Sequence, residues 1–201
     1  MKIKRLFCIL LAACVLMACF VFAAGRPSDW AKDEIDADMA SLLELVNPAL
    51  NYQGSITRKE FCYIALDSLH KISGIEMNTM VENPFTDTND ALVLAAYALG
   101  VVKGTSDTTF SPDSPVSRQE MCVMLYRVLE KAGKDTGFSG APLDGFSDKG
   151  QVADWAKAET SFAVSAGIMK GVTEKRLAPL ENCQVEQALV LAARMVKNYS
   201  L

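Results

Sequence analysis

Three related segments follow one another in the sequence, and this repetition constrains the fold more than any other feature. Gly100-Val-Val-Lys-Gly104 matches Gly167-Ile-Met-Lys-Gly171. Residues 29–32 and 154–157 share the sequence Asp-Trp-Ala-Lys, which indicates a looser copy ahead of the other two. A unit of about 50 residues buries too little surface to fold alone, so such units become stable by packing on one another. The three copies are therefore expected to share a core.

Each copy has the pattern of a helix, a loop and a second helix. Apolar residues recur at helical spacing, and the alternation typical of strands is hardly visible. Polar, glycine-containing stretches near 74–83 and 133–145 separate the copies. The pattern predicts an all-α fold of three helix-loop-helix repeats. The expected helices cover 35–46 and 61–72, 88–100 and 117–132, and 153–167 and 183–198.

The second helix of the first two copies begins with a capping box. Thr57 with Glu60, and Ser117 with Glu120, are spaced so that hydroxyl and carboxylate each accept a hydrogen bond from a free backbone N–H group. This local role explains both glutamates without a catalytic function. The third copy has glutamines at both positions, and we expect Asn182 to cap its helix instead.

Arg58 and Arg118 lie just inside these caps, where the partial positive charge of a helix N-terminus disfavours a cation. A helix N-terminus also binds anions, and an arginine beside it adds a bidentate donor for a carboxylate or phosphate. One interpretation is therefore an anion site. The alternatives are an ion pair with an acid such as Asp87 or Asp148, or a solvated side chain. The third copy has Val185 at this position.

The first 23 residues have the pattern of a secretory signal peptide. Three basic residues precede an uncharged apolar run that ends in small residues, and cleavage is expected after Ala23. Two alternatives are an uncleaved membrane anchor and a lipoprotein attached through Cys14 or Cys19, each of which follows a lipobox-like sequence. The chain is predicted to be exported.

Charge and cysteine content bear on the class of function. Without the signal peptide, 17 basic residues face 24 acidic ones, which gives a net charge of −7. A nucleic-acid partner is therefore not expected, and any anionic ligand must be held by a local cluster of cations. Cys62, Cys122 and Cys183 are an odd number without a Cys-x-x-Cys motif, so no disulfide framework is predicted. The first two lie in apolar helices, which favours buried free thiols.

No motif for an enzyme or a cofactor is recognisable in the sequence. Residues 86–90, Thr-Asp-Thr-Asn-Asp, superficially suggest a calcium loop, but they lack its glycine and its distal glutamate. A turn followed by a helix cap is the favoured interpretation, and no metal site is predicted.

The order of the motifs resembles that of S-layer homology repeats, the modules that anchor many bacterial surface proteins to the cell wall. The family pattern runs from a phenylalanine–x–aspartate pair through tryptophan–alanine, a glycine-bounded turn and a phenylalanine–x–proline loop to a Thr-Arg-Ala-Glu-like motif. The matching residues are Phe85/Asp87, Phe146/Asp148, Trp30-Ala31, Trp155-Ala156, 100–104, 167–171, Phe110-Ser-Pro112, 57–60 and 117–120. The likeness covers nearly the whole chain after the signal peptide.

This resemblance implies a fold, a function and a set of site residues. It implies a pseudo-threefold helical spindle with repeats at 25–76, 81–136 and 141–201. Its grooves would bind an anionic secondary cell-wall polysaccharide linked to peptidoglycan, often bearing pyruvylated sugar, and so hold the protein at the cell wall or cell surface. The implied binding residues are Arg58, Arg118, Trp30, Trp155, Asp87, Asp148, Lys103 and Lys170. For both tryptophans, packing in the core is the alternative.

The chain departs from the family pattern, and this leaves a second hypothesis open. The third repeat lacks the motif arginine and the second lacks the tryptophan, so at most two competent grooves are expected. The alternative is a structural or assembly protein whose degenerate repeats pack on S-layer partners or on copies of the chain; an exported enzyme is a third, weaker hypothesis. Wall binding predicts exposed Arg58 and Arg118 beside aromatic residues. Assembly predicts those arginines in intramolecular ion pairs and an exposed apolar patch elsewhere.

Overall fold

The computed structural model describes residues 25–76 and 81–200, so the signal-peptide and lipidation predictions fall outside the described residues. In these ranges the chain forms helices and no strand, which confirms the all-α prediction. The α-helices are α2 (Ala37–Val46), α3 (Arg58–Ser73), α4 (Ala91–Ala98), α5 (Arg118–Lys131), α6 (Lys157–Ser165) and α7 (Val185–Tyr199). Two 3-10 helices, η1 (Lys149–Gln151) and η2 (Asp154–Ala156), lead into α6. None of the described helices is long and apolar enough to cross a membrane.

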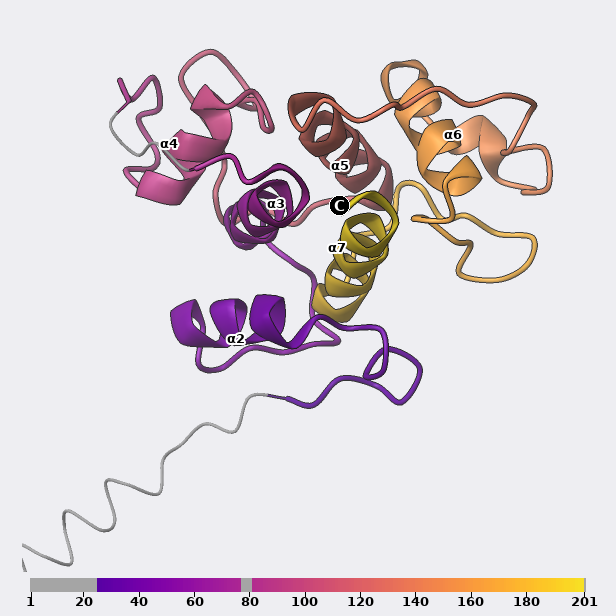
Figure 1. Cartoon of the computed structure of the whole chain (residues 1–201), viewed down its shortest axis with the longest axis horizontal. Helices are drawn as coiled ribbons and strands as arrows, with labels where there is room; N and C mark the ends of the chain where they lie inside the picture. The colour runs from indigo at the N-terminus through magenta and orange to yellow at the C-terminus, as the bar shows by residue number, and fades with distance from the viewer. Residues whose placement is uncertain (1–24, 77–80, 201) are drawn as a thin grey trace, which may run out of the picture.

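The second helices of the three repeats lie together in the middle of the molecule, with the first helices around them (Figure 1). α3, α5 and α7 contact one another in all three pairings. α4 packs against α3, and α6 packs against α5. The first helix of the second and of the third repeat therefore lies on the second helix of the preceding repeat. This packing of helices from different repeats explains why one hydrophobic core extends through all three repeats.

A closed cycle of backbone hydrogen bonds joins the three repeats just before their second helices. Ile56 N–H donates to the carbonyl of Cys183 at 2.9 Å, Cys183 N–H to Val116 at 2.8 Å, and Val116 N–H to Ile56 at 3.2 Å. Each of these residues stands two positions before its helix, and each is fully buried. Buried backbone groups need such partners, so each repeat satisfies its neighbour. The pseudo-threefold spindle as a whole stays a prediction.

The capping predictions are confirmed for two helices and wrong for the third. Thr57 with Glu60, and Ser117 with Glu120, form complete capping boxes at α3 and α5. α7 begins after Gln184, whose N–H donates to Gln187 Oε1 at 3.3 Å. Asn182 does not cap this helix, because its backbone forms an antiparallel bridge with Ser117.

The cysteines of the described residues are free and buried, as expected for Cys62 and Cys122. Burial raises the pKa of Cys62, Cys122 and Cys183 to about 12. Nearly all of each thiol is therefore protonated at neutral pH, and protonated buried thiols react slowly. Their role is to fill the core between the repeats.

Candidate functional site

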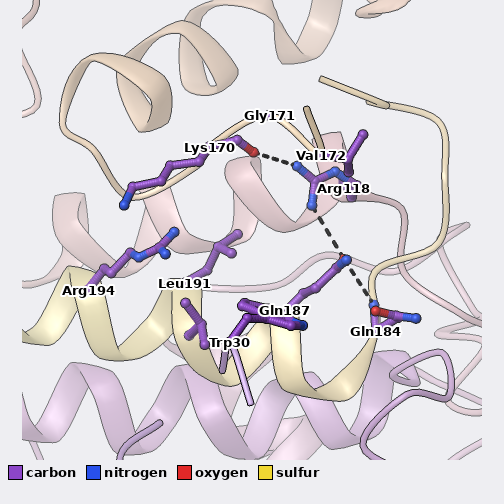
Figure 2. A pocket seen from close by; sticks show the side chains of 10 residues that line it. Trp30, Arg118, Lys170, Gly171, Val172, Gln184, Gln187, Leu191 and Arg194 are labelled. Carbon is purple, nitrogen blue, oxygen red and sulfur yellow. Dashed lines mark hydrogen bonds between the residues drawn. The ribbon is translucent and has the colours of Figure 1, made fainter. Parts of the chain in front are cut away.

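Two surface grooves are lined by residues from equivalent positions of the repeats. We name them after their tryptophans: the Trp30 groove, with a volume of about 360 Å³, and the Trp155 groove, with about 470 Å³. The lining of the Trp30 groove (Figure 2) includes Trp30, Arg118, Lys170, Gln187, Leu191 and Arg194. The equivalent residues of the Trp155 groove are Trp155, Arg58, Lys103, Glu120, Met124 and Arg127.

Each groove combines residues from all three repeats. In the Trp30 groove, the tryptophan comes from the first repeat, Arg118 from the second, and Lys170 with α7 from the third. In the Trp155 groove, the tryptophan comes from the third repeat, Arg58 from the first, and Lys103 with α5 from the second. Six of the eight predicted site residues are brought together in this way. A single repeat carries no complete groove, which is why the motifs of one copy alone are uninformative.

The two tryptophans lie at the surface, so the alternative of core packing is wrong. Trp30 is 51% exposed and Trp155 is 57% exposed. The segments that carry them are anchored from below by the second residue of a neighbouring helix. Glu186 accepts hydrogen bonds from Ser28 N–H at 2.8 Å and from Ser28 Oγ at 3.0 Å. Gln119 Oε1 accepts one from Ala153 N–H at 3.0 Å.

Arg58 is buried at the floor of the Trp155 groove, where backbone carbonyls accept most of its hydrogen bonds. Its Nε donates to Phe110 O at 2.9 Å and its Nη2 to Lys103 O at 2.9 Å. The guanidinium carbon lies 4.8 Å from the centre of the Phe110 ring, a cation–π distance. Burial lowers the pKa of Arg58, an effect that the negative charge of Glu120 opposes and the positive charge of Arg127 strengthens. Arg58 therefore ties the second repeat to the first.

Arg118 makes the corresponding contacts to the third repeat. Its Nε donates to Leu177 O at 2.9 Å, its Nη2 to Lys170 O at 2.7 Å, and its Nη1 to Gln187 Oε1 at 3.4 Å (Figure 2). The expectation that both arginines are exposed is wrong, since Arg58 and Arg118 are 8% and 4% exposed. Within residues 25–76 and 81–200, the ion pairs expected from the assembly hypothesis are also not formed, because the partners of the two guanidinium groups are carbonyl and amide oxygens and the sulfur of Met169.

Asp87 and Asp148 lie outside both grooves and hold the loop that follows each glycine turn. Asp87 accepts hydrogen bonds from the backbone N–H groups of Phe110, at 2.9 and 3.1 Å, and of Ser111, at 2.7 Å. Asp148 accepts from Leu177 at 2.9 Å and from Ala178 at 2.8 Å. These positions do not bring the two carboxylates to the grooves. Residues 86–90 contain a bend and a helix cap, as favoured from the sequence, because Asp90 accepts from Leu92 N–H and Val93 N–H at the start of α4.

Lys103 and Lys170 line the grooves from the glycine-bounded turns, as predicted from the sequence. Both carbonyls accept from a motif arginine, while the Nζ atoms form no ion pair with the residues in 25–76 and 81–200. Figure 2 shows the side chains of Lys170, Arg118 and Arg194 around one hollow, with Trp30 beside Gln187. Each groove therefore presents cations next to an indole.

Arg127 and Arg194 are groove residues that the sequence interpretation missed. Arg127 lies nine residues after Arg118, and Arg194 lies nine residues after Val185. Aligning the second helices over their full length, rather than over the motif alone, would have revealed this recurrence. At the same position α3 has Asp67, which forms an ion pair with Lys71 at 2.9 Å.

The place equivalent to the two grooves at the junction of α7 with α3 has a different chemistry. Val185 is buried where the other repeats have an arginine. Tyr63 stands where the two grooves have Val123 and Val190, and its hydroxyl donates to Asp90 at 2.6 Å. Asp67 stands where they have Arg127 and Arg194, so a carboxylate replaces a cation there. This chemistry agrees with the expectation of at most two competent grooves, which stays a prediction.

A comparison with protein families finds a match for two segments of the chain. The sequence model of the S-layer homology domain matches residues 93–122 and 145–183. Residues 93–122 and 145–183 therefore have the sequence pattern of S-layer homology domains. The first matched segment contains the α5 capping box with Arg118, and the second ends two residues before α7 begins.

Several curated proteins are similar to parts of the chain. The endoglucanase of Bacillus sp. (strain KSM-635) is 38% identical over 100 residues, which are 49% of this chain and 10% of that protein. The cellulosome-anchoring protein of Acetivibrio thermocellus is 30% identical over 97 residues, or 45% of this chain and 22% of that protein. The surface-layer 125 kDa protein of Lysinibacillus sphaericus is 30% identical over 79 residues, or 39% of this chain and 6% of that protein.

The S-layer homology domains and these relatives support attachment to a cell surface as the general role. The chain spans no more than about a fifth of the length of these three relatives. The likeness to the endoglucanase covers a tenth of that enzyme, so no catalytic activity follows from it.

Proposed function

We propose that the chain attaches an exported protein to a bacterial cell wall by binding an anionic wall polysaccharide in the Trp155 and Trp30 grooves. The observation that carries this proposal is the pairing, in each groove, of an exposed indole with lysine and arginine side chains. An indole offers a broad apolar face on which a sugar ring can lie. The cations supply the local attraction that an anion needs against a chain with excess acidic residues.

A sugar carrying a carboxylate, such as a pyruvate ketal, has the chemistry that this pairing favours. Its ring and its anion are joined within one residue of the polymer, just as the indole and the cations lie within one groove. Arginine and lysine form charge-assisted hydrogen bonds with carboxylates, which are about twice as strong as neutral ones. The cellulosome-anchoring and surface-layer relatives agree with a role in attachment.

Co-sedimentation with purified cell walls tests this function. The protein without its first 23 residues is incubated with walls before and after chemical removal of the secondary polymer. We expect retention on intact walls only. Replacing both indoles, Trp30→Ala with Trp155→Ala, is expected to weaken retention about tenfold or more, because stacking area is lost from both grooves.

Phe138→Ala is the matched control, since Phe138 is an aromatic residue that is 41% exposed and lines neither groove. It should be retained as the unmodified protein is. Equal retention of the double tryptophan variant would contradict binding in the grooves. Retention on stripped walls would show that the polymer is not the partner.

Self-association is a second candidate function, and one feature of α2 favours it. Leu45 is 79% exposed and its neighbour Val46 is 46% exposed, at the end of a surface helix. Adjacent exposed apolar residues can form part of a contact between proteins. Sedimentation equilibrium of the unmodified protein and of Leu45→Ser decides the question. A monomer at all concentrations would exclude this candidate.

A further inference from the structure

The two grooves differ in the state of one equivalent arginine. Arg194, in the Trp30 groove, forms a bidentate ion pair with Glu34 of the first repeat: Nε to Oε2 at 2.6 Å and Nη2 to Oε1 at 2.7 Å. Its Nη1 donates further to the carbonyl of Ile168 at 3.4 Å. The side chain of Arg194 is only 16% exposed, so this pair is partly shielded from solvent. The guanidinium of Arg194 is therefore already bound to a carboxylate of the chain itself.

Arg127 lies at the same position of the Trp155 groove, and no carboxylate of the described residues is bound to it in this way. It forms no ion pair with any residue of the described ranges. It lines the groove together with Arg58 and Lys103, and its positive charge contributes to the lowered pKa of Arg58. The acid of this groove, Glu120, accepts hydrogen bonds through Oε2 from Ser117 N–H at 2.8 Å and Ser117 Oγ at 2.6 Å.

The difference follows from the backbone around the two tryptophans. Glu34 and Glu159 both lie four residues after a tryptophan. Glu159 lies within α6, whose helix begins immediately after η2. Glu34 lies in a turn, because α2 begins only at Ala37 behind its cap Asp36. The turn brings Glu34 to Arg194, whereas Glu159 forms no ion pair within the part of the chain that the structure describes.

We propose that a sugar carboxylate binds to Arg127 in the Trp155 groove, and that Glu34 takes the place of this carboxylate in the Trp30 groove, so that the two grooves bind the polymer unequally. The inference rests on the proposed function and specifies it. Its chemical basis is the bidentate contact of Glu34 with Arg194, which shows that a carboxylate fits the guanidinium at this position of a groove. Glu34 acts as an internal competitor for the Trp30 groove.

The two tryptophans allow each groove to be followed separately. The sequence has two tryptophans, one in each groove, so the two indole N–H signals in a ¹H–¹⁵N spectrum report the two sites. The probe is a monosaccharide with a 4,6-pyruvate ketal, titrated into the protein without its signal peptide. The methyl ester of the same ketal, which has no charge, is the ligand control. Wall sedimentation is measured for the same samples.

We expect the Trp155 signal to titrate at a probe concentration about tenfold or more below that of Trp30. Glu34→Ala should strengthen binding at Trp30 by about the same factor, because Arg194 is released. The matched control Glu159→Ala should leave both titrations unchanged. Arg127→Gln should abolish the response of Trp155 only, and Arg194→Gln should cancel the gain caused by Glu34→Ala. Thermal unfolding of every variant checks that the fold is intact.

Several results would overturn the inference. Equal titration of both indoles in the unmodified protein would show that Glu34 does not compete. An unchanged Trp30 response in Glu34→Ala, or a retained Trp155 response in Arg127→Gln, would reject the assigned roles. If no indole responds while the protein still binds intact walls, the carboxylate inference fails and the proposed function stands. If wall binding is also absent, both fail.

Discussion

Arg118 and its neighbour Gln119 serve two tasks at the start of α5. The guanidinium of Arg118 holds the glycine turn of the third repeat, while Gln119 holds the backbone ahead of Trp155. The resemblance to S-layer homology repeats implied a groove at this arginine, and Arg118 does line the Trp30 groove. The sequence could not predict which donors remain for a ligand, because the accepting carbonyls lie more than 50 residues away. Asp87 and Asp148 lie outside both grooves, because they accept hydrogen bonds from backbone N–H groups 23 to 30 residues further along their own repeats.

Arg118→Ala should lower the free energy of unfolding by roughly 2–4 kcal/mol, since several hydrogen bonds to a buried charge are lost and the carbonyls of Leu177 and Lys170 lose their partner. Urea unfolding followed by circular dichroism measures this. Arg26→Ala, which removes an exposed arginine, should change it by less than about 0.5 kcal/mol. Equal stability of the two variants would show that Arg118 does not support the fold.

Acid should weaken the loops held by Asp87 and Asp148. Hydrogen bonds from Phe110 N–H and Ser111 N–H lower the pKa of Asp87. Partial burial raises the pKa of Asp148, but the N–H groups of Leu177 and Ala178 keep it below its ordinary value. Lowered pKa values stabilise the fold above the ordinary value of 3.8, and this contribution is lost as pH falls through the folded-state values.

The urea concentration at the midpoint of unfolding should therefore decrease as the pH is lowered from about 5 to about 2, roughly the window in which these carboxylates become protonated. Asp148→Asn should show a smaller fall over the same range, because it has no charge to lose there. A fall of the same size in the variant would assign the acid sensitivity to other groups.

At the scale of helices, apolar spacing located the six α-helices of the described residues, but it did not predict which helices pack together. The helix predicted at 153–167 is divided, since η2 precedes α6, and α7 extends one residue beyond its predicted end. These differences lie at helix ends, where apolar spacing gives little information about the terminal residues. The packing of α4 on α3 and of α6 on α5 was not predictable, because similar apolar faces suit the helix of either repeat.

The glycine turns that carry Lys103 and Lys170 are the elements most sensitive to an added methyl group. A Cβ on Gly171 would overlap the carbonyls of Thr173 and Arg176 and the ring of Phe146. Gly171→Ala should therefore lower the free energy of unfolding by about 1–3 kcal/mol. Gly150→Ala is the control, because a Cβ there meets no atom within 4 Å. Thermal unfolding of both variants measures the difference; no difference would mean that the turn can move aside.

At the scale of the whole molecule, the three repeats share one hydrophobic core. Residues Phe61, Leu125 and Leu189 from α3, α5 and α7 are buried in one core. The sequence predicted this shared core, since a single helix pair cannot form one. The composition of each groove from three repeats required the structure, because it depends on the order in which repeats neighbour one another.

A fragment of residues 25–136 should fail to fold, because it loses α7 and two of the three backbone hydrogen bonds of the cycle. Circular dichroism and tryptophan fluorescence of residues 25–201 should show one coincident unfolding transition. The fragment should show no cooperative transition in urea. A sharp transition of the fragment would indicate that two repeats suffice.

The backbone cycle through Ile56, Val116 and Cys183 has no first member. The order in which the repeats follow one another along the chain could therefore be changed without changing how they pack together. A circular permutant that begins at residue 81 and joins residue 200 to residue 25 through a flexible linker should close the same cycle. Its third repeat, without a motif arginine, would then sit mid-chain, and both grooves should still assemble.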